Sequence, residues 1–288
     1  MTSPVKPDAK QRDTIIQSAS AEINLCWTCG SCSFECPVNI ATDRLQPRNL
    51  VFMANLGLLD ELVNLPDIWY CLQCRRCSNV CPMTVKPADL ISFLRMEAIS
   101  QQVVSSETFL EYERLYRQLH RVRWHAASHC LSNENGPDIS AAWEEWSTAP
   151  VDSFAGEISY DQAVSVPETY GKAIDETGVA SCYTCGECSS GCPVFGEKDV
   201  FDPRLIFRMI CFGLTDQLLQ SPVIWLCVDC RRCTDNCSQN VLGHQMIKHL
   251  QELAVQEGVV RDGFPQQWKD VNTEIYTVFL DKVDEVLK

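Results

Sequence analysis

One cysteine spacing occurs four times in this sequence, and it constrains the fold more than any other feature. Each copy reads C-x2-C-x2-C-x3-C, as in CLQCRRCSNVCP at positions 71–82. The chain has 18 cysteines, and 16 of them belong to these four motifs. Thiols at such regular spacing indicate a framework of disulfides or of metal sites. The 16 residues are Cys26, Cys29, Cys32, Cys36, Cys71, Cys74, Cys77, Cys81, Cys182, Cys185, Cys188, Cys192, Cys227, Cys230, Cys233 and Cys237.

The four motifs form two pairs, because the second half of the chain repeats the first at an offset of 156 residues. DIWYCLQCRRCSNVCP at 67–82 returns as VIWLCVDCRRCTDNCS at 223–238. In both pairs, the last cysteine of one motif lies 35 positions before the first cysteine of the next. Three motifs end in Cys-Pro, whereas Ser238 follows Cys237. So regular a repeat indicates a tandem duplication of one domain.

The spacing within a motif is typical of iron-sulfur clusters. Thiolates at i, i+3 and i+6 wrap around three iron corners of a cubane, and in the bacterial two-cluster pattern the fourth cysteine ligates the other cluster. We therefore predict four 4Fe-4S clusters with crossed ligands. The predicted ligand sets are Cys26, Cys29, Cys32 and Cys81; Cys71, Cys74, Cys77 and Cys36; Cys182, Cys185, Cys188 and Cys237; and Cys227, Cys230, Cys233 and Cys192.

Zinc and disulfides are the two alternatives. Structural zinc favours two C-x2-C pairs about 15 to 20 residues apart and has no use for a third cysteine at i+6. Disulfides are typical of secreted proteins, but MTSPVKPDAKQRDTIIQSAS at 1–20 lacks the apolar segment of a signal peptide. No run of 18 apolar residues predicts a membrane span. We expect a cytoplasmic chain without direct membrane insertion.

Charge and missing motifs narrow the function further. The net charge of −14 argues against a nucleic-acid partner, because phosphate binding needs a basic surface. Nothing resembles a phosphate-binding loop, a dinucleotide-binding turn or a Ser/His/Asp set. Cubanes with four thiolate ligands leave no open position for a substrate. We expect no catalytic residues, and interpret the chain as a non-catalytic electron carrier within an oxidoreductase.

The residues between the motifs predict a mostly α-helical fold. In DPRLIFRMICFG, Asp202 is a candidate N-cap, Pro203 suits the first helical position and Gly213 suits the position past the end. LTDQLLQ is a second short helical run, and Ser221 is a candidate cap for SPVIWLC. The predicted domains are a polar extension at 1–21, a first domain with trailing helices at 22–130, a linker at 131–177 and a second domain with trailing helices at 178–288.

The order CWTCGSCSFECP, helix, Pro-Arg, helix, DIWYCLQCRRCSNVCP resembles the α-helical ferredoxin domain, and most closely HdrC, the third subunit type of heterodisulfide reductase. The resemblance covers about 22–115 and 178–275. It implies a subunit that relays electrons between an HdrA-like flavin and iron-sulfur subunit and an HdrB-like catalytic subunit with cysteine-rich CCG domains. A typical HdrC carries one such domain, whereas this chain carries two. A free multi-cluster ferredoxin shuttle and a subunit of a membrane-anchored, quinone-linked oxidoreductase are the alternatives.

Several residues outside the ligand sets carry two interpretations. The arginine pairs between ligands either tune cluster potential or form ordinary surface ion pairs, and the tryptophan before each second motif most simply packs against a helix. Gly30 and Gly186 are expected to let backbone N–H groups approach sulfur. A metal site of His125, His129 and Cys130 is the less ordinary alternative to a solvated helix. The other residues in question are Arg75, Arg76, Arg231, Arg232, Trp69 and Trp225, His120 on the same helix, Cys211 and Cys130 as packing thiols, and Trp143 and Trp146 as docking residues of the linker.

Overall fold

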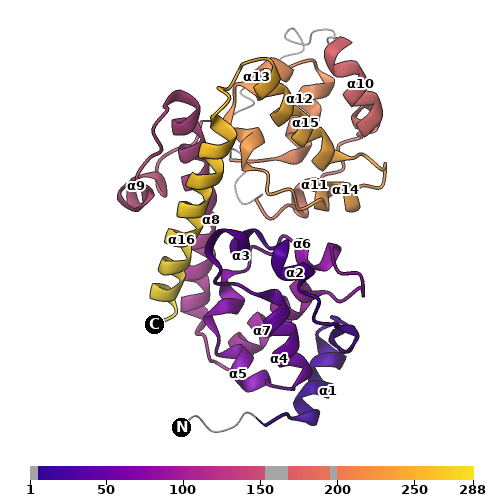
Figure 1. Cartoon of the computed structure of the whole chain (residues 1–288), viewed down its shortest axis with the longest axis vertical. Coiled ribbons are helices and arrows are strands. Elements are labelled where there is room, and N and C mark those ends of the chain that lie inside the picture. Colours follow the sequence, from indigo (N-terminus) through magenta and orange to yellow (C-terminus); the bar gives the residue numbers. More distant parts are fainter. Residues whose placement is uncertain (1–5, 153–167, 195–199) are drawn as a thin grey trace. The chain divides into compact units, whose positions relative to one another are not determined.

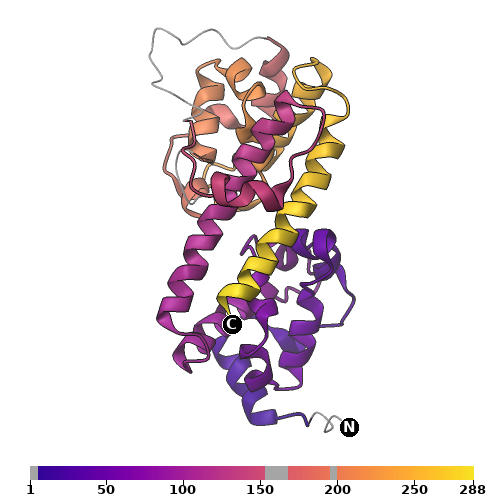
Figure 2. The ribbon, with the colours of Figure 1, turned by 90° about the vertical axis from the view of Figure 1, so that its left-hand side faces the viewer.

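The computed structural model describes residues 6–152, 168–194 and 200–288, and within these ranges the chain consists of helices and loops without a β-strand (Figures 1 and 2). The predicted mostly α-helical fold is confirmed. Internal contacts divide the chain into unit 1, Met1–Leu115 with Tyr276–Lys288, and unit 2, Tyr116–Ile275. The division falls within the two longest helices, α8 (Ser106–Ser132) and α16 (Phe264–Val286).

Unit 1 holds the first pair of cysteine motifs. Helices α4, α5 and α7 pack around a core that includes Leu50, Leu62 and Leu94, all buried. Residues 9–18 of the predicted polar extension form helix α1, which buries Ile15 and packs on α4 and α5. Besides parts of α8 and α16, the elements are α1 (Ala9–Ser18), α2 (Ser31–Phe34), α3 (Pro37–Thr42), α4 (Pro47–Asn55), α5 (Leu59–Val63), α6 (Arg76–Asn79) and α7 (Pro87–Ser100), with 3-10 turns at Ile23–Leu25 and Pro66–Tyr70.

Unit 2 repeats these elements at the 156-residue offset of the sequence. Its core contains Ile206, Leu218 and Leu250 at the positions of the three leucines named above. Helix α10 is additional and packs on α15. The elements are α9 (Ile139–Trp146), α10 (Glu168–Thr177), α11 (Glu187–Ser190), α12 (Pro203–Cys211), α13 (Thr215–Leu219), α14 (Arg232–Asp235) and α15 (Gly243–Gln256), with 3-10 turns at Val179–Ser181 and Pro222–Leu226.

The local signals for helix ends act as predicted. The Asp202 carboxylate accepts hydrogen bonds from the first backbone N–H groups of α12, with Arg204 N at 2.9 Å, and Gly213 follows the helix with φ of +73°. Left-handed backbone of this kind is the reason for a glycine there. Ser221 also caps, through the N–H of Val223, but the segment it begins is a 3-10 turn rather than an α-helix.

Part of the predicted linker is folded onto unit 2. Asp138 caps α9, whose Trp143 is only 1% exposed, so the expected docking of this segment is confirmed. Trp146 contacts the rings of His125 and His129, at 6.1 Å between ring centroids in both cases. Residues 153–167 of the linker lie outside the described ranges. The boundaries at 21, 130 and 177 follow the repeat rather than the contacts, and they stay a prediction.

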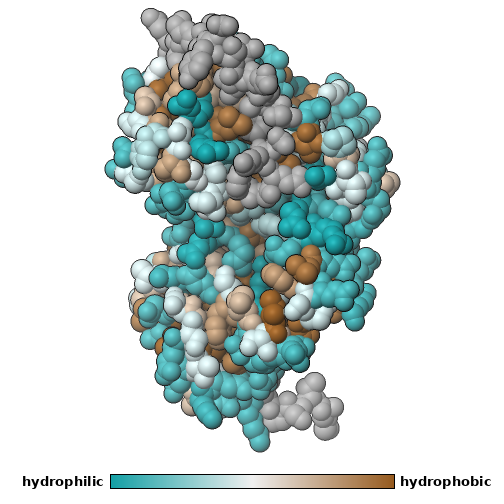
Figure 3. All heavy atoms as spheres, turned by 180° about the vertical axis from the view of Figure 1, so that it is seen from behind, coloured by the Kyte–Doolittle hydropathy of each residue, from teal (hydrophilic) through white to brown (hydrophobic). Residues whose placement is uncertain are grey.

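The visible surface is predominantly polar. Figure 3 shows a face on which hydrophilic residues predominate and hydrophobic ones lie between them. The chain carries 38 acidic against 24 basic residues, so this surface is acidic on balance. Within the described ranges, no helix is long and apolar enough to span a bilayer.

Candidate iron-sulfur sites

Each cysteine motif forms a loop that turns through two residues of positive φ and then enters a short helix. In the first motif these residues are Thr28 at +54° and Gly30 at +90°, and α2 follows directly. Left-handed backbone directs consecutive N–H groups to one side of a loop, which creates a concave binding surface. The expected role of Gly30 and Gly186 agrees with this geometry. The same two positions have positive φ in the other motifs: Gln73 and Arg75, Thr184 and Gly186, and Asp229 and Arg231.

Backbone N–H groups in these loops donate to cysteine sulfurs. The N–H of Thr28 donates to Cys26 Sγ at 3.3 Å, and the N–H of Gln73 donates to Cys71 Sγ at 3.3 Å. Asp229 repeats the contact in unit 2, with 3.4 Å to Cys227 Sγ. Hydrogen bonds to the sulfurs stabilise negative charge on a bound cluster and help to set its potential.

Two cavities bring together cysteines from different motifs. The cavity in unit 1 is lined by Cys26, Cys29 and Cys32 of the first motif and by Cys81 of the second. We call these four the outer set of unit 1. The corresponding cavity in unit 2 is lined by the outer set of that unit, which is Cys182, Cys185, Cys188 and Cys237, and also by Cys233.

The remaining predicted ligands of unit 1 form its inner set, which is Cys71, Cys74, Cys77 and Cys36. All four residues are buried. Burial raises the pKa of the Cys77 thiol well above its usual range, and the neighbouring Cys71, Cys74 and Cys36 raise it further. Burial also raises the pKa of Cys36 to about 12, with a further contribution from Cys71. Cys36 therefore lies among the thiols of the other motif, as the crossed assignment requires.

The inner set of unit 2 is Cys227, Cys230, Cys233 and Cys192. Burial raises the pKa of Cys233 strongly, and Cys227, Cys230 and Cys192 add to this effect. In each unit, one outer thiol also acts on an inner one: Cys32 raises the pKa of Cys77, and Cys188 raises that of Cys233. The two sets of a unit are thus neighbours. The structure assembles all four sets, and ligation by these 16 cysteines stays a prediction.

Outer and inner sets differ in their access to solvent. Cys29 and Cys185 are exposed, whereas the inner set of unit 1 is fully enclosed and Cys230 and Cys233 are buried in unit 2. Trp27, between two outer ligands of unit 1, is 73% exposed. An exposed side chain and an exposed ligand at the outer set give another protein direct access to it. Each inner set is reached through its outer neighbour.

The donors fit the 4Fe-4S clusters that the sequence predicts. Each set offers four sulfurs, backbone N–H donors and, in the outer sets, a cavity enclosed by the ligand loops. Fully cysteinyl ligation is the usual arrangement of such clusters. In the part of the chain that the structure describes, no group of three or more His, Cys, Asp or Glu side chains is arranged around a single metal ion, and that includes His125, His129 and Cys130.

The arginines between the ligands form ion pairs in unit 1. Arg75 pairs with Asp89, and Arg76 donates to Glu35 Oε2 at 2.7 Å. The ordinary interpretation of the arginine pair therefore holds for both residues. Arg76 has a further effect, because its charge opposes the burial that raises the pKa of Cys36. Trp69 packs as expected, 5.1 Å from the ring of Tyr112. Trp225 packs against Phe264 in unit 2, and Arg232 opposes the rise in the pKa of Cys230.

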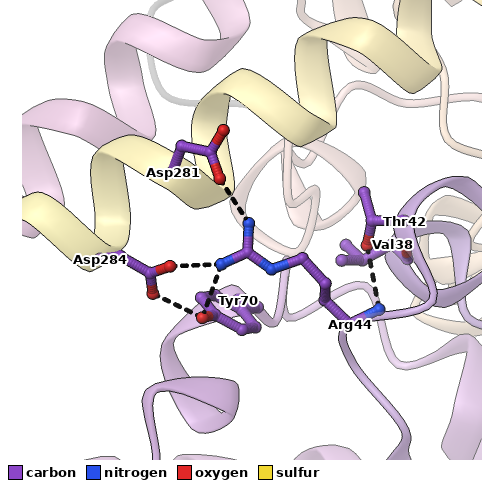
Figure 4. Close-up of polar contacts among 6 residues, drawn as sticks. All are labelled: Val38, Thr42, Arg44, Tyr70, Asp281 and Asp284. Atoms are coloured by element: carbon purple, nitrogen blue, oxygen red, sulfur yellow. Dashed lines mark hydrogen bonds and ion pairs between the residues drawn. The ribbon is translucent and has the colours of Figure 1, made fainter.

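A polar network around Arg44 fixes the segments that precede and follow two inner ligands (Figure 4). Arg44 donates to Asp281 at 2.7 Å, to the Tyr70 hydroxyl at 2.9 Å and to Asp284, and the Tyr70 hydroxyl donates to Asp284. Tyr70 directly precedes Cys71, and Arg44 follows α3, which begins after Cys36. The end of α16 thus holds both segments of unit 1. No local motif in the sequence signals this contact.

Ser238, which replaces the expected proline, has a partner. Its hydroxyl and that of Tyr183 are 2.8 Å apart and hydrogen-bonded. Tyr183 lies between two outer ligands of unit 2, and Ser238 follows a third, so the bond joins the two loops of that set. The corresponding residues in unit 1 are Trp27 and Pro82, which have no hydroxyl groups.

The two cysteines outside the motifs differ from each other. Cys130 is fully buried, so the prediction of a packing thiol is confirmed. Cys211 is exposed, so the same prediction is wrong for it. Its thiol donates to the Val179 carbonyl at 3.6 Å, where the corresponding Asn55 of unit 1 donates to the Ile23 carbonyl at 2.7 Å. Cys211 therefore occupies a hydrogen-bonding position of the repeat.

A comparison with known families identifies both repeats. Residues 22–85 and 178–241 match the family described as "4Fe-4S dicluster domain". Two dicluster domains provide for four 4Fe-4S clusters, in agreement with the prediction. The matched segments contain all 16 motif cysteines.

Comparison with curated proteins shows the same kind of relative. The chain is 34% identical over 80 residues to the iron-sulfur subunit HdrC of the CoB–CoM heterodisulfide reductase of Methanopyrus kandleri, which covers 28% of this chain and 41% of that protein. It is 30% identical over 109 residues to an HdrC-like protein of Archaeoglobus profundus, covering 38% and 58%. The chain thus spans about half of the relatives it matches. The "Probable iron-sulfur-binding oxidoreductase FadF" of Bacillus subtilis is 27% identical over 141 residues, which are 46% of this chain and 16% of that protein.

Proposed function

Since this chain is a tandem pair of 4Fe-4S dicluster domains that resembles HdrC, we propose that it is the electron-transfer subunit of a heterodisulfide-reductase-like complex. Bound clusters supply one-electron redox chemistry. The chain's own residues supply the thiolate ligands, the N–H donors to sulfur and the enclosure that excludes water from the inner sets. Its partners are a flavin and iron-sulfur subunit on one side and a CCG-domain catalytic subunit on the other.

The observation that carries the proposal is the crossed grouping of thiols in each unit. Four cysteines drawn from two motifs gather around one cavity, and a second group lies directly beside it. Neighbouring clusters are what an electron relay needs, whereas a structural site has no use for two adjoining groups. The exposed Cys29 and Cys185 allow another protein to approach the outer set of each unit.

Metal and spectroscopic analysis tests the proposal directly. Iron, acid-labile sulfide and zinc are measured per chain after strictly anaerobic purification, and EPR spectra are recorded after dithionite reduction. We expect about 16 iron and 16 sulfide with spin-coupled signals, since four cubanes contain four irons each. About 12 iron points to one missing cluster, and the unit 2 outer set next to Ser238 is examined first. About 4 zinc with little iron contradicts electron transfer altogether.

Affinity purification of the tagged full chain from its own cells tests the partners. Recovery with a flavoprotein and a CCG-domain protein supports the proposed complex. A chain recovered alone but still exchanging electrons with enzymes is a free shuttle. Recovery with a haem-containing membrane subunit favours a quinone-linked oxidoreductase. The last two results each contradict a heterodisulfide-reductase-like assembly.

A further inference from the structure

The inner sets need positive charge close to them. A cluster with four thiolates is an anion, and an anion buried in a low-dielectric interior is unfavourable without donors and cations nearby. In unit 1 the two arginines of the motif are already paired with Asp89 and Glu35. Another cation therefore has to act on the inner set.

Arg95 of α7 meets this need in unit 1. Its Nε donates to the carbonyl of Ile68 at 2.7 Å, and its Nη2 donates to the carbonyls of Trp69 at 3.1 Å and Cys71 at 2.7 Å. The guanidinium lies 5.4 Å from the Trp69 ring centroid and 5.1 Å from that of Tyr112. All three hydrogen bonds go to carbonyl oxygens, so no carboxylate cancels the charge. Arg95 thus holds the segment that leads into an inner ligand and places a cation behind it.

Unit 2 replaces the hydrogen bonds of this arginine with neutral groups. Gln251 occupies the position of Arg95 and donates to the Ile224 carbonyl at 2.8 Å. Trp268 occupies the position of Tyr112, and its Nε1 donates to the Trp225 carbonyl at 2.9 Å. Two neutral donors therefore satisfy two of the three carbonyls that one guanidinium satisfies in unit 1.

The cation of unit 2 comes from another helix. Arg123 of α8 is only 2% exposed, and its guanidinium lies 6.0 Å from the ring centroid of Trp268. Its Nε donates to the amide oxygen of Asn272 at 3.1 Å. Burial of an arginine is costly without a compensating negative charge, and the inner set of unit 2 lies beyond the segment that Trp268 contacts.

We propose that Arg95 in unit 1 and Arg123 in unit 2 are the buried cations that raise the reduction potential of the inner cluster of their own unit. The proposal rests on the proposed function, because it requires clusters at the inner sets. A fixed positive charge favours the reduced state of a cluster, which carries one more negative charge. Both arginines act through the surrounding electric field and are positioning residues.

Redox titration of the full chain, followed by EPR, tests the proposal with Arg95→Gln and Arg123→Gln. Glutamine fits at position 95, because Gln251 occupies the corresponding position in unit 2. We expect each variant to lower the reduction equilibrium constant of one signal about tenfold, which is about 59 mV for one electron. The two variants should shift different signals, and the double variant should shift both. Lys172→Gln removes the same charge from an exposed side chain and should shift neither.

Two further variants separate charge from packing. Arg95→Lys keeps the charge and should retain most of the wild-type potential. Gln251→Arg adds a cation beside the inner set of unit 2 and should raise the potential of the signal that Arg123→Gln lowers, which keeps the proposal testable where Arg95→Gln loses its cluster. Unchanged potentials in variants that retain their inner signals overturn the proposal. Absence of cluster signals from the wild-type chain instead contradicts the proposed function.

Discussion

Removal of the Arg44 side chain should loosen unit 1 next to its inner set. We consider Arg44→Met, which keeps the length of the side chain and removes the charge. Asp281 is 64% exposed at its side chain, so its ion pair contributes close to nothing. Asp284 is 33% exposed and receives hydrogen bonds from both Arg44 and the Tyr70 hydroxyl. Charge-assisted hydrogen bonds of this partly buried kind contribute about 1 kcal/mol each after allowance for solvent.

The expected loss of stability for Arg44→Met is therefore about 2 kcal/mol, from the bonds to Tyr70 and Asp284. Asp284→Asn should cost about 1 kcal/mol, because the amide still accepts one hydrogen bond. Asp281→Asn is the matched control and should cost less than about 0.5 kcal/mol. The three variants thus rank by the exposure of the group that each one loses.

Calorimetry of the anaerobic protein measures the ranking as shifts of the unfolding temperature, and loss of iron-sulfur absorbance on warming measures the consequence for the clusters. Because Tyr70 and Arg44 adjoin the segments of Cys71 and Cys36, Arg44→Met should lose the inner cluster of unit 1 first, with iron falling from about 16 to about 12 per chain. An effect of Asp281→Asn as large as that of Arg44→Met would refute the reasoning from exposure. So would an unchanged unfolding temperature for Arg44→Met.

Three other predictions test the sites and their surroundings. Cys36→Ala should abolish the inner cluster of unit 1 and Cys81→Ala the outer one, each about 4 iron per chain, and the opposite assignment of EPR signals would contradict crossed ligation. Ser238→Ala and Tyr183→Phe should each destabilise unit 2 by about 0.5 kcal/mol, since the bond is exposed, and in a double-mutant cycle the double variant should lose no more than either single one. Burial lowers the pKa of His120 to about 3, below its unfolded value near 6.5, so the unfolded state binds more protons as pH falls and stability decreases from about pH 6.5 towards pH 3. At pH 5 this amounts to about 2 kcal/mol, and His120→Gln should abolish that part of the acid sensitivity in pH-dependent unfolding.

Much of the site could be predicted from the sequence because its signals are local. A cysteine spacing describes one loop, and Asp202 and Gly213 mark helix ends within a few residues of themselves. The crossed grouping also followed, since the spacing itself is typical of shared clusters. The exposure of Cys211 was missed, because the sequence of its helix does not show which side faces solvent. Arg95 was missed for a similar reason, as one arginine in a helix of ordinary composition.

The sequence alone determined the ligand candidates, the duplication and the helical class of this protein. Only the tertiary structure decided which thiols are enclosed and which charges lie near them. Arg44 and Asp284 are 240 residues apart, and no pattern in the chain connects them. The corresponding Arg95 and Gln251 look like an ordinary difference between repeats until their carbonyl partners are known. Spacing governs a single loop, but burial and electrostatics depend on every segment that packs around it.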